Sequence, residues 1–140
     1  MVYATLQQFI EAFGQQLTIE LTNLENAEAT EIDEAVFDRS AARAAGLING
    51  YLAGRYALPL AKIPDVLKSI ALDIQRYQMG HNAQEEDVRQ RYEDALRLLE
   101  QLAKGQISLG LPAADTPPAL GRPQWTTRPR VFSPDRLRNY

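Results

Sequence analysis

The prolines of this chain are concentrated at one end, which limits where regular structure can form. Six of the eight prolines lie in the last 36 residues, from Gly105 to Tyr140. Proline lacks a backbone N–H and fixes φ, so this segment is a poor candidate for helix or sheet. It carries five arginines and two acids, whereas residues 1–104 carry ten basic and sixteen acidic side chains. The sequence therefore predicts an acidic body of net charge −6 and an extended basic arm of net charge +3.

Apolar residues in the first half of the body recur at helical spacing. Thr5 and Gln8 have capping-box spacing at the start of a short helix over about 5–13, which Gly14 would end. The next stretch, about 17–21, alternates apolar and polar residues over too few positions for a strand, so we expect an extended or one-turn connection. A long central helix is predicted over about 32–55. Its apolar positions are Ile32, Val36, Phe37, Ala41, Ala44, Leu47, Ile48, Tyr51 and Leu52.

Two further helices complete the predicted body. Pro64 is expected in the first turn of a third helix that ends near Met79. Asn82 and Glu85 again have capping-box spacing, and a fourth helix runs from there to Lys104. The sequence thus predicts an all-α fold, a small antiparallel bundle of about four helices with a long central helix. We expect the helical body to span residues 1–107 and the extended Pro/Arg-rich arm to span 108–140.

Composition excludes several classes of protein. The chain has no cysteine, so disulfides, thiolate catalysis and cysteine-based zinc sites are ruled out. The single histidine, His81, has no second histidine or thiol with which to share a metal, and we expect no cofactor and no enzymatic activity. No apolar run approaches the roughly 20 residues that a bilayer-spanning helix needs, so we expect no membrane association. The protein should be made and kept in a cytoplasm.

Two local patterns call for a structural explanation. Gly46, Gly50 and Gly54 recur every four residues along the predicted long helix, which would permit close helix contact within or between subunits, or would be incidental. Asp73 lies near the apolar face of the third helix, where a carboxylate needs a partner. Arg76 is available on the same helix, so we predict a structural ion pair between Asp73 and Arg76. Arg55 and Arg91 are alternative partners across the bundle.

A resemblance to a known family comes from four stretches of the sequence. They are Ile48–Leu60, read as INGYLAGRYALPL, then Asp73–Tyr77, Val88–Leu96 and Arg130–Asp135. Together they resemble a Mu-like phage family of small proteins whose genes lie among head and neck genes. The resemblance covers most of residues 1–107 and about the last dozen. Its most specific positions are Gly50, Tyr51, Gly54, Arg55, Tyr56 and Pro59.

The resemblance implies a structural role in the phage particle. A member of this family would be a head-tail connector, also called an adaptor or head-completion protein. Such subunits would form a ring under the portal protein, with twelve copies expected to match the portal. The ring would extend the DNA channel and contact the next neck or tail-completion protein. Double-stranded DNA would pass through the lumen without specific binding, and the protein would reside at the neck of the virion after synthesis in the bacterial cytoplasm.

The C-terminal arm is the predicted portal-docking segment. It combines apolar anchors with arginines that can donate paired hydrogen bonds to carboxylates or carbonyls. The residues expected to make these contacts are Arg128, Arg130, Val131, Phe132, Arg136, Leu137 and Arg138. A disordered solubilising tail is the alternative interpretation of the same composition.

Other classes of function remain open at this point. A phage or prophage nucleic-acid-binding regulator would use the basic arm on phosphates, but it should also show a basic recognition helix, and the predicted helices are net acidic. An interaction protein or chaperone outside the virion would also suit a helical body with an arm. An enzyme would need a nucleophile, base or metal constellation that the sequence does not show.

Overall fold

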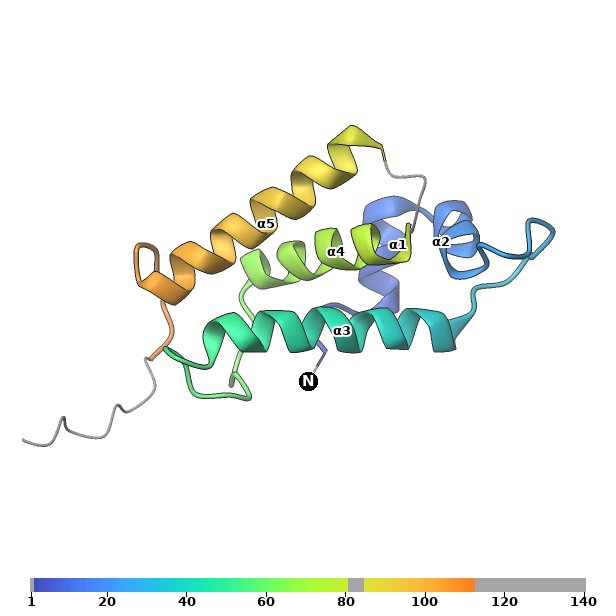
Figure 1. Cartoon of the computed structure of the whole chain (residues 1–140). Helices are drawn as coiled ribbons and strands as arrows, with labels where there is room; N and C mark the ends of the chain where they lie inside the picture. Colours follow the sequence, from blue (N-terminus) through green and yellow to red (C-terminus); the bar gives the residue numbers. More distant parts are fainter. Residues whose placement is uncertain (1, 81–84, 113–140) are drawn as a thin grey trace, which may run out of the picture.

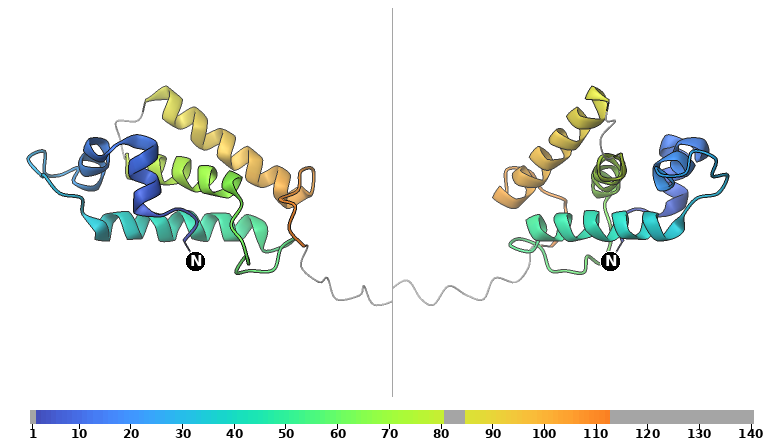
Figure 2. Two further views of the ribbon diagram at one scale, coloured as in Figure 1. Left: turned by 180° about the vertical axis from the view of Figure 1, so that it is seen from behind. Right: turned by 45° about the vertical axis from the view of Figure 1, so that its right-hand side comes forward.

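The computed structural model describes residues 2–80 and 85–112 (Figure 1). Within these residues the chain forms five helices and no strand. They are α1 Leu6–Phe13, α2 Gln15–Thr22, α3 Glu34–Leu52, α4 Asp65–Met79 and α5 Glu86–Lys104. The long helices α3, α4 and α5 pack together with successive helices antiparallel, and α1 and α2 lie at one end of this layer (Figures 1 and 2). The all-α prediction is confirmed, with one helix more than expected.

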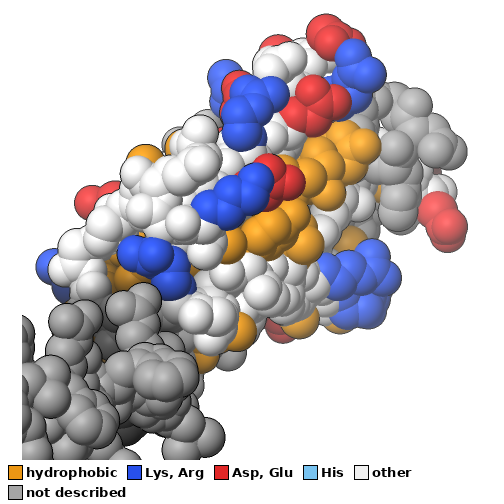
Figure 3. All heavy atoms as spheres, turned by 60° about the vertical axis from the view of Figure 1, so that its left-hand side comes forward, with side chains coloured by type: hydrophobic (Ala, Val, Ile, Leu, Met, Phe, Trp, Pro, Cys, Tyr) orange, Lys and Arg blue, Asp and Glu red, His pale blue; other side chains and the backbone are white. Residues whose placement is uncertain are grey.

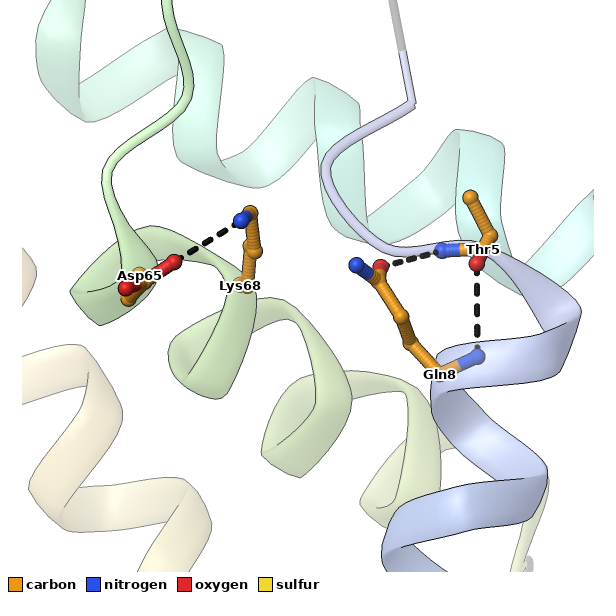
Figure 4. Close-up of polar contacts among 4 residues, drawn as sticks. All are labelled: Thr5, Gln8, Asp65 and Lys68. Carbon is orange, nitrogen blue, oxygen red and sulfur yellow. Dashed lines mark hydrogen bonds and ion pairs between the residues drawn. The ribbon is translucent and has the colours of Figure 1, made fainter.

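The first helix begins with the predicted capping box. The Thr5 hydroxyl accepts a hydrogen bond from the Gln8 backbone N–H at 3.3 Å, and the Gln8 side chain accepts one from the Thr5 N–H at 2.9 Å (Figure 4). These two bonds satisfy backbone donors that the first helical turn leaves without partners. Gly14, with φ of +92°, ends α1 as predicted, because its N–H reaches the Ile10 carbonyl in a conformation that favours glycine.

The expected extended connection at about 17–21 was wrong, because residues 15–22 form α2. The helical face of α2 includes two threonines, so an apolar pattern could not reveal it. Thr18 and Thr22 are buried, and their hydroxyls donate to the carbonyls of Gly14 and Thr18, each at 2.8 Å. Back-bonding of this kind allows threonine to occupy a buried helical position.

The starts of the later helices differ slightly from prediction. Asp33 caps α3, which begins two residues later than expected, and its Oδ1 accepts from the N–H groups of Ala35 and Val36. Pro64 immediately precedes α4, and Lys68 pairs with Asp65 at 2.8 Å in the first turn (Figure 4). The α5 helix begins at Glu86, so Glu85 precedes the helix; its predicted capping partner Asn82 lies outside the described residues.

The core has two parts. The larger lies between α3, α4 and α5, where the most deeply buried side chains are Ile48, Leu52, Leu67, Ile74, Leu99 and Leu102. The smaller attaches α1 and α2 to α3 and the end of α4. Phe9 is fully buried there, 5.7 Å from Phe37 between ring centroids in an edge-on arrangement, with Met79 in the same cluster. This second cluster fixes the α1–α2 pair to one end of the long-helix layer.

Candidate functional site

The resemblance motif meets the beginning of the arm. Tyr56 follows α3 and is buried, with 3% of its surface exposed. Its hydroxyl oxygen accepts a hydrogen bond at 3.1 Å from the backbone N–H of Leu109, which is 53 residues further along the chain. Leu109 and Leu111 pack against the larger core cluster. The first residues of the predicted arm, 108–112, are therefore held on the body, and packing continues past the predicted boundary at 107.

Hydrogen-bond donors and a positive charge surround the Tyr56 hydroxyl at this contact. Burial by itself opposes ionisation of the phenol. The backbone hydrogen bond from Leu109, the Ser108 side chain and the positive charge of Arg55 outweigh burial and lower the pKa of Tyr56.

A second contact of the motif lies at the end of α5. Gly105 has φ of +74°, the left-handed conformation that ends many helices, and its N–H reaches the carbonyls of Gln101 and Leu102. The Arg55 guanidinium lies over it, so that a β-carbon on Gly105 would be 1.8 Å from Arg55 Nη1. Arg55 Nε is buried there without a hydrogen-bond partner. Arg55 and Tyr56 therefore hold the chain where it leaves α5.

The remaining motif residues have different surroundings. Gly50 and Gly54 are exposed, and a β-carbon on either would have no atom within 4 Å. The same is true of Gly46, so the predicted close helix contact does not occur within the described part of the subunit. Tyr51 is half-buried against the larger core, and the exposed Pro59 follows Leu58 through a cis peptide bond.

The surroundings of Asp73 are not those predicted. Among the described residues, the ion pairs with N–O distances up to 4.0 Å do not include one between Asp73 and Arg76. Burial raises the pKa of Asp73; the charge of Arg91 on α5 opposes the rise, and Asp94 adds to it. The basic charge that acts on Asp73 is thus Arg91, which the sequence offered as an alternative partner.

Tyrosines form a cluster between α4 and α5. The rings of Tyr77 and Tyr92 stack with centroids 3.9 Å apart and planes 4° from parallel. Burial, followed by the influence of Tyr77 and Tyr51, raises the pKa of Tyr92.

Figure 3 shows a band of hydrophobic side chains on one face of the molecule, flanked by basic and acidic side chains. Such an arrangement, an apolar strip with a charged border, is common at protein interfaces.

Arg128, Arg130, Val131, Phe132, Arg136, Leu137 and Arg138 all lie outside the described residues, as does His81. Within residues 2–80 and 85–112, no cluster of three or more histidine or acidic side chains could hold a metal ion. Nor does any helix of those residues combine the length and apolar character required to cross a membrane.

Sequence reasoning identified the motif but not its partners at the end of α5. The predicted boundary at 107 assigned Leu109 and Leu111 to the arm. A signal for their role was present, because two leucines separated by Gly110 follow the helix directly and precede the proline-rich segment.

Comparison with known proteins bears out the resemblance. Residues 3–126 match the family described as Bacteriophage Mu, Gp36, so the match continues through 108–126, which the motifs did not cover. The Mu-like prophage FluMu protein gp36 of Haemophilus influenzae is 37% identical over 111 residues, covering 79% of this chain and 77% of that protein. Gene product J of Escherichia phage Mu is 30% identical over 135 residues, 95% of each chain. The chain is therefore a member of the bacteriophage Mu Gp36 family.

Proposed function

We propose that this phage protein is a head-tail connector subunit. In this role it forms a ring under the portal protein, with twelve copies, extends the DNA channel and joins the head to the next neck or tail-completion protein. It acts through assembly and needs no catalysis. The proposal rests on family membership together with the division of the chain into a compact body and an arm of opposite charge.

The observation that carries the proposal is the fixed origin of the arm. Tyr56 and Arg55 hold residues 105–109 at one end of the helical body, beside the end of α3 and α5. Every copy in an assembly would then present its arm from the same point and in the same direction. A short segment that extends from a rigid body can reach a neighbouring protein without disturbing the core of its own subunit.

The charge distribution suits a neck protein through which DNA passes. Residues 1–112 hold ten basic and sixteen acidic side chains, and residues 113–140 hold five basic and two acidic ones. A body of net charge −6 repels phosphates and would let DNA slide, whereas a basic lumen would retain it. The net charge of +3 on the arm is better suited to an acidic or carbonyl-rich surface on the portal.

Binding to the portal protein tests this proposal. We expect full-length protein to bind purified portal rings, and a chain that ends at residue 127 to remain folded but to lose this binding. Phe132→Ala should weaken binding by more than about 1 kcal/mol, roughly fivefold or more, because aromatic anchors often dominate such interfaces. Ser133→Ala is the matched control and should bind as the unaltered protein does. Equal binding by the chain that ends at residue 127 would exclude the docking role of the arm.

A DNA-binding assay beside the portal assay tests the alternative, a nucleic-acid-binding regulator. Such a protein would bind duplex DNA in a salt-dependent manner through the arm and would not bind portal. We expect this protein to bind portal and not to bind duplex DNA. Fluorescence anisotropy with labelled duplex DNA, at low and physiological salt, measures DNA binding in parallel with the portal assay.

A further inference from the structure

A groove lies at the end of the body opposite the root of the arm. It has a volume of about 520 Å³ and is formed by α2, the loop that follows α2, α3 and the end of α4. Leu21, Leu24, Val36 and Met79 contribute apolar surface. Leu24 is 47% exposed at the rim of the groove, which leaves it available to a partner. The helices and loop that form the groove lie at one end of the ribbon, and the segment that follows α5 lies at the other (Figure 1).

Hydrogen bonds hold the groove in shape. The loop between α2 and α3 is tied at its base, where Asn23 Nδ2 donates to the Glu31 carbonyl at 2.7 Å. The Asp33 N–H donates to the Thr22 hydroxyl at 3.1 Å. The two ends of the loop are therefore fixed to each other and to α2. A preformed groove binds with a lower entropic cost than one that must first be ordered.

The groove contains polar groups without partners. Among the described residues, Arg39 and Arg43 line the groove, are exposed to solvent, and form no ion pair and no side-chain hydrogen bond within the protein. Gln78 Oε1 is buried in the same wall and accepts no hydrogen bond. The groove thus offers spare donors on α3 and one buried acceptor on α4. A buried acceptor without a donor is costly, so an occupant that supplies an N–H would be favoured.

We infer that this groove binds residues Leu120–Trp125 from the arm of a second copy of the chain. This inference rests on the proposed assembly into a ring, and it assigns the segment between the body and the portal-docking residues. Trp125 is the single tryptophan of the protein. Its indole is large and apolar, and its N–H is a donor only, which matches an apolar groove with a free acceptor at Gln78.

Backbone acceptors of the arm also match donors of the groove. Pro123 within the segment, and Pro117 and Pro118 just before it, lack backbone N–H groups but keep their carbonyls, so this part of the arm has more backbone acceptors than donors. Arg39 and Arg43 supply the missing donors. Residues 25–38, which include the loop beside the groove, hold six acids and no base, and Arg122 can approach them from the arm.

The position of the root, at the opposite end of the body from the groove, favours a neighbour as the donor of the segment. From Pro112 to Trp125 the chain spans at most about 45 Å and α3 alone is about 28 Å long, so the arm is long enough to reach either groove. To fill its own groove, the arm would have to return along most of its own body. A neighbour placed head to tail would bring its groove beside the root. Repeated head-to-tail contacts of this type close into a ring when the rotation is suitable.

A peptide titration tests the groove without portal or a ring. The recipient is the full-length chain with Trp125→Ala, which contains no tryptophan, and the probe is a peptide of residues 117–127. We expect saturable binding, seen as a blue shift of tryptophan emission from the peptide. Leu24→Glu in the recipient should weaken binding at least tenfold. Val66→Glu, at a similarly exposed apolar residue on α4 away from the groove, should leave it unchanged.

Two further measurements test whether the groove is specific for this segment and whether docking occurs between copies. An unlabelled peptide of residues 128–140 is more basic but lacks tryptophan, and it should not displace the probe. Displacement by it, no binding up to millimolar peptide, or equal binding to the Leu24→Glu recipient would each overturn the inference. In the unaltered chain, Trp125 emission should shift to shorter wavelength as protein concentration rises. An emission maximum independent of concentration would overturn docking between copies. Because no portal is present, these results are independent of the portal-binding test.

Discussion

Gly105 and Arg55 fit together only because Gly105 has no side chain. The Arg55 guanidinium occupies the position beside Gly105 where a β-carbon would lie, with Nη1 1.8 Å from that position. Gly105 also adopts φ of +74°, which other residues adopt only with strain. The guanidinium is the far end of a flexible side chain and can move, so the left-handed φ is the stronger requirement for glycine where the helical body passes into the arm.

Alanine at Gly105 should destabilise the protein, whereas alanine at Gly50 should stabilise it. The first change forces a strained left-handed conformation, at about 1–2 kcal/mol, and displaces Arg55. The second is made in α3 with open space around it and should add up to about 1 kcal/mol through helix propensity. Urea unfolding followed by circular dichroism measures both. Equal effects of the two substitutions would contradict the left-handed conformation of Gly105.

Removing the Tyr56 hydroxyl should loosen the root of the arm. In Tyr56→Phe, the Leu109 N–H loses its acceptor while the buried ring is kept, so the free energy of unfolding should fall by about 0.5–1.5 kcal/mol. Hydrogen exchange at the Leu109 amide should accelerate. Tyr51→Phe, at a half-buried motif residue on α3, is the control and should change neither quantity appreciably. An unaltered Leu109 exchange rate in Tyr56→Phe would refute the proposed anchor.

The buried amide of Gln75 is expected to destabilise the folded protein, and replacing it should increase the free energy of unfolding. Its side chain is 1% exposed, neither polar atom has a hydrogen-bond partner, and the adjacent cavity is too small to admit water. Gln75→Met keeps a similar volume and removes the unpaired amide, so it should stabilise the protein by about 1–3 kcal/mol. Gln15→Met, at an exposed position in α2, should have an effect within about 0.5 kcal/mol. Loss of stability in Gln75→Met would show that the amide has a bonding partner.

The stability contribution of Asp73 should depend on pH in a defined direction. Its pKa is raised from 3.8 in the folded protein, mainly by burial, so the folded state binds this proton more tightly than the unfolded chain does. The carboxyl therefore favours folding below pH 3.8, and that contribution is lost as pH rises through the folded pKa. Asp73→Asn should then increase the free energy of unfolding at pH 7, with a gain that shrinks towards pH 4.

Urea titrations of both proteins at pH 4, 5.5 and 7 provide the measurement. A loss of stability at pH 7 in Asp73→Asn would indicate a strong ion pair, and would support the original assignment of Arg76 as the partner. Arg76→Gln distinguishes the two cases, because it should have little effect if Arg91 is the charge that acts on Asp73.

The sequence alone was sufficient for features that depend on neighbouring residues. Helical spacing of apolar residues placed α1, α3, α4 and α5 to within a few residues, and the capping box at Thr5 was identified directly. The compositional break after residue 104 separated the acidic body from the basic arm. These signals are local, because helix formation and capping involve residues only three or four positions apart.

Tertiary structure decided the contacts between distant residues. The α2 helix was missed because its buried face contains threonines whose hydroxyls bond within the helix. The role of Tyr56 emerged only when folding brought Leu109 to it across 53 residues, and the charge beside Asp73 proved to be Arg91 on another helix. Such pairings depend on how complete helices pack, and a periodic pattern shows which face of a helix is buried but not which residues lie against it.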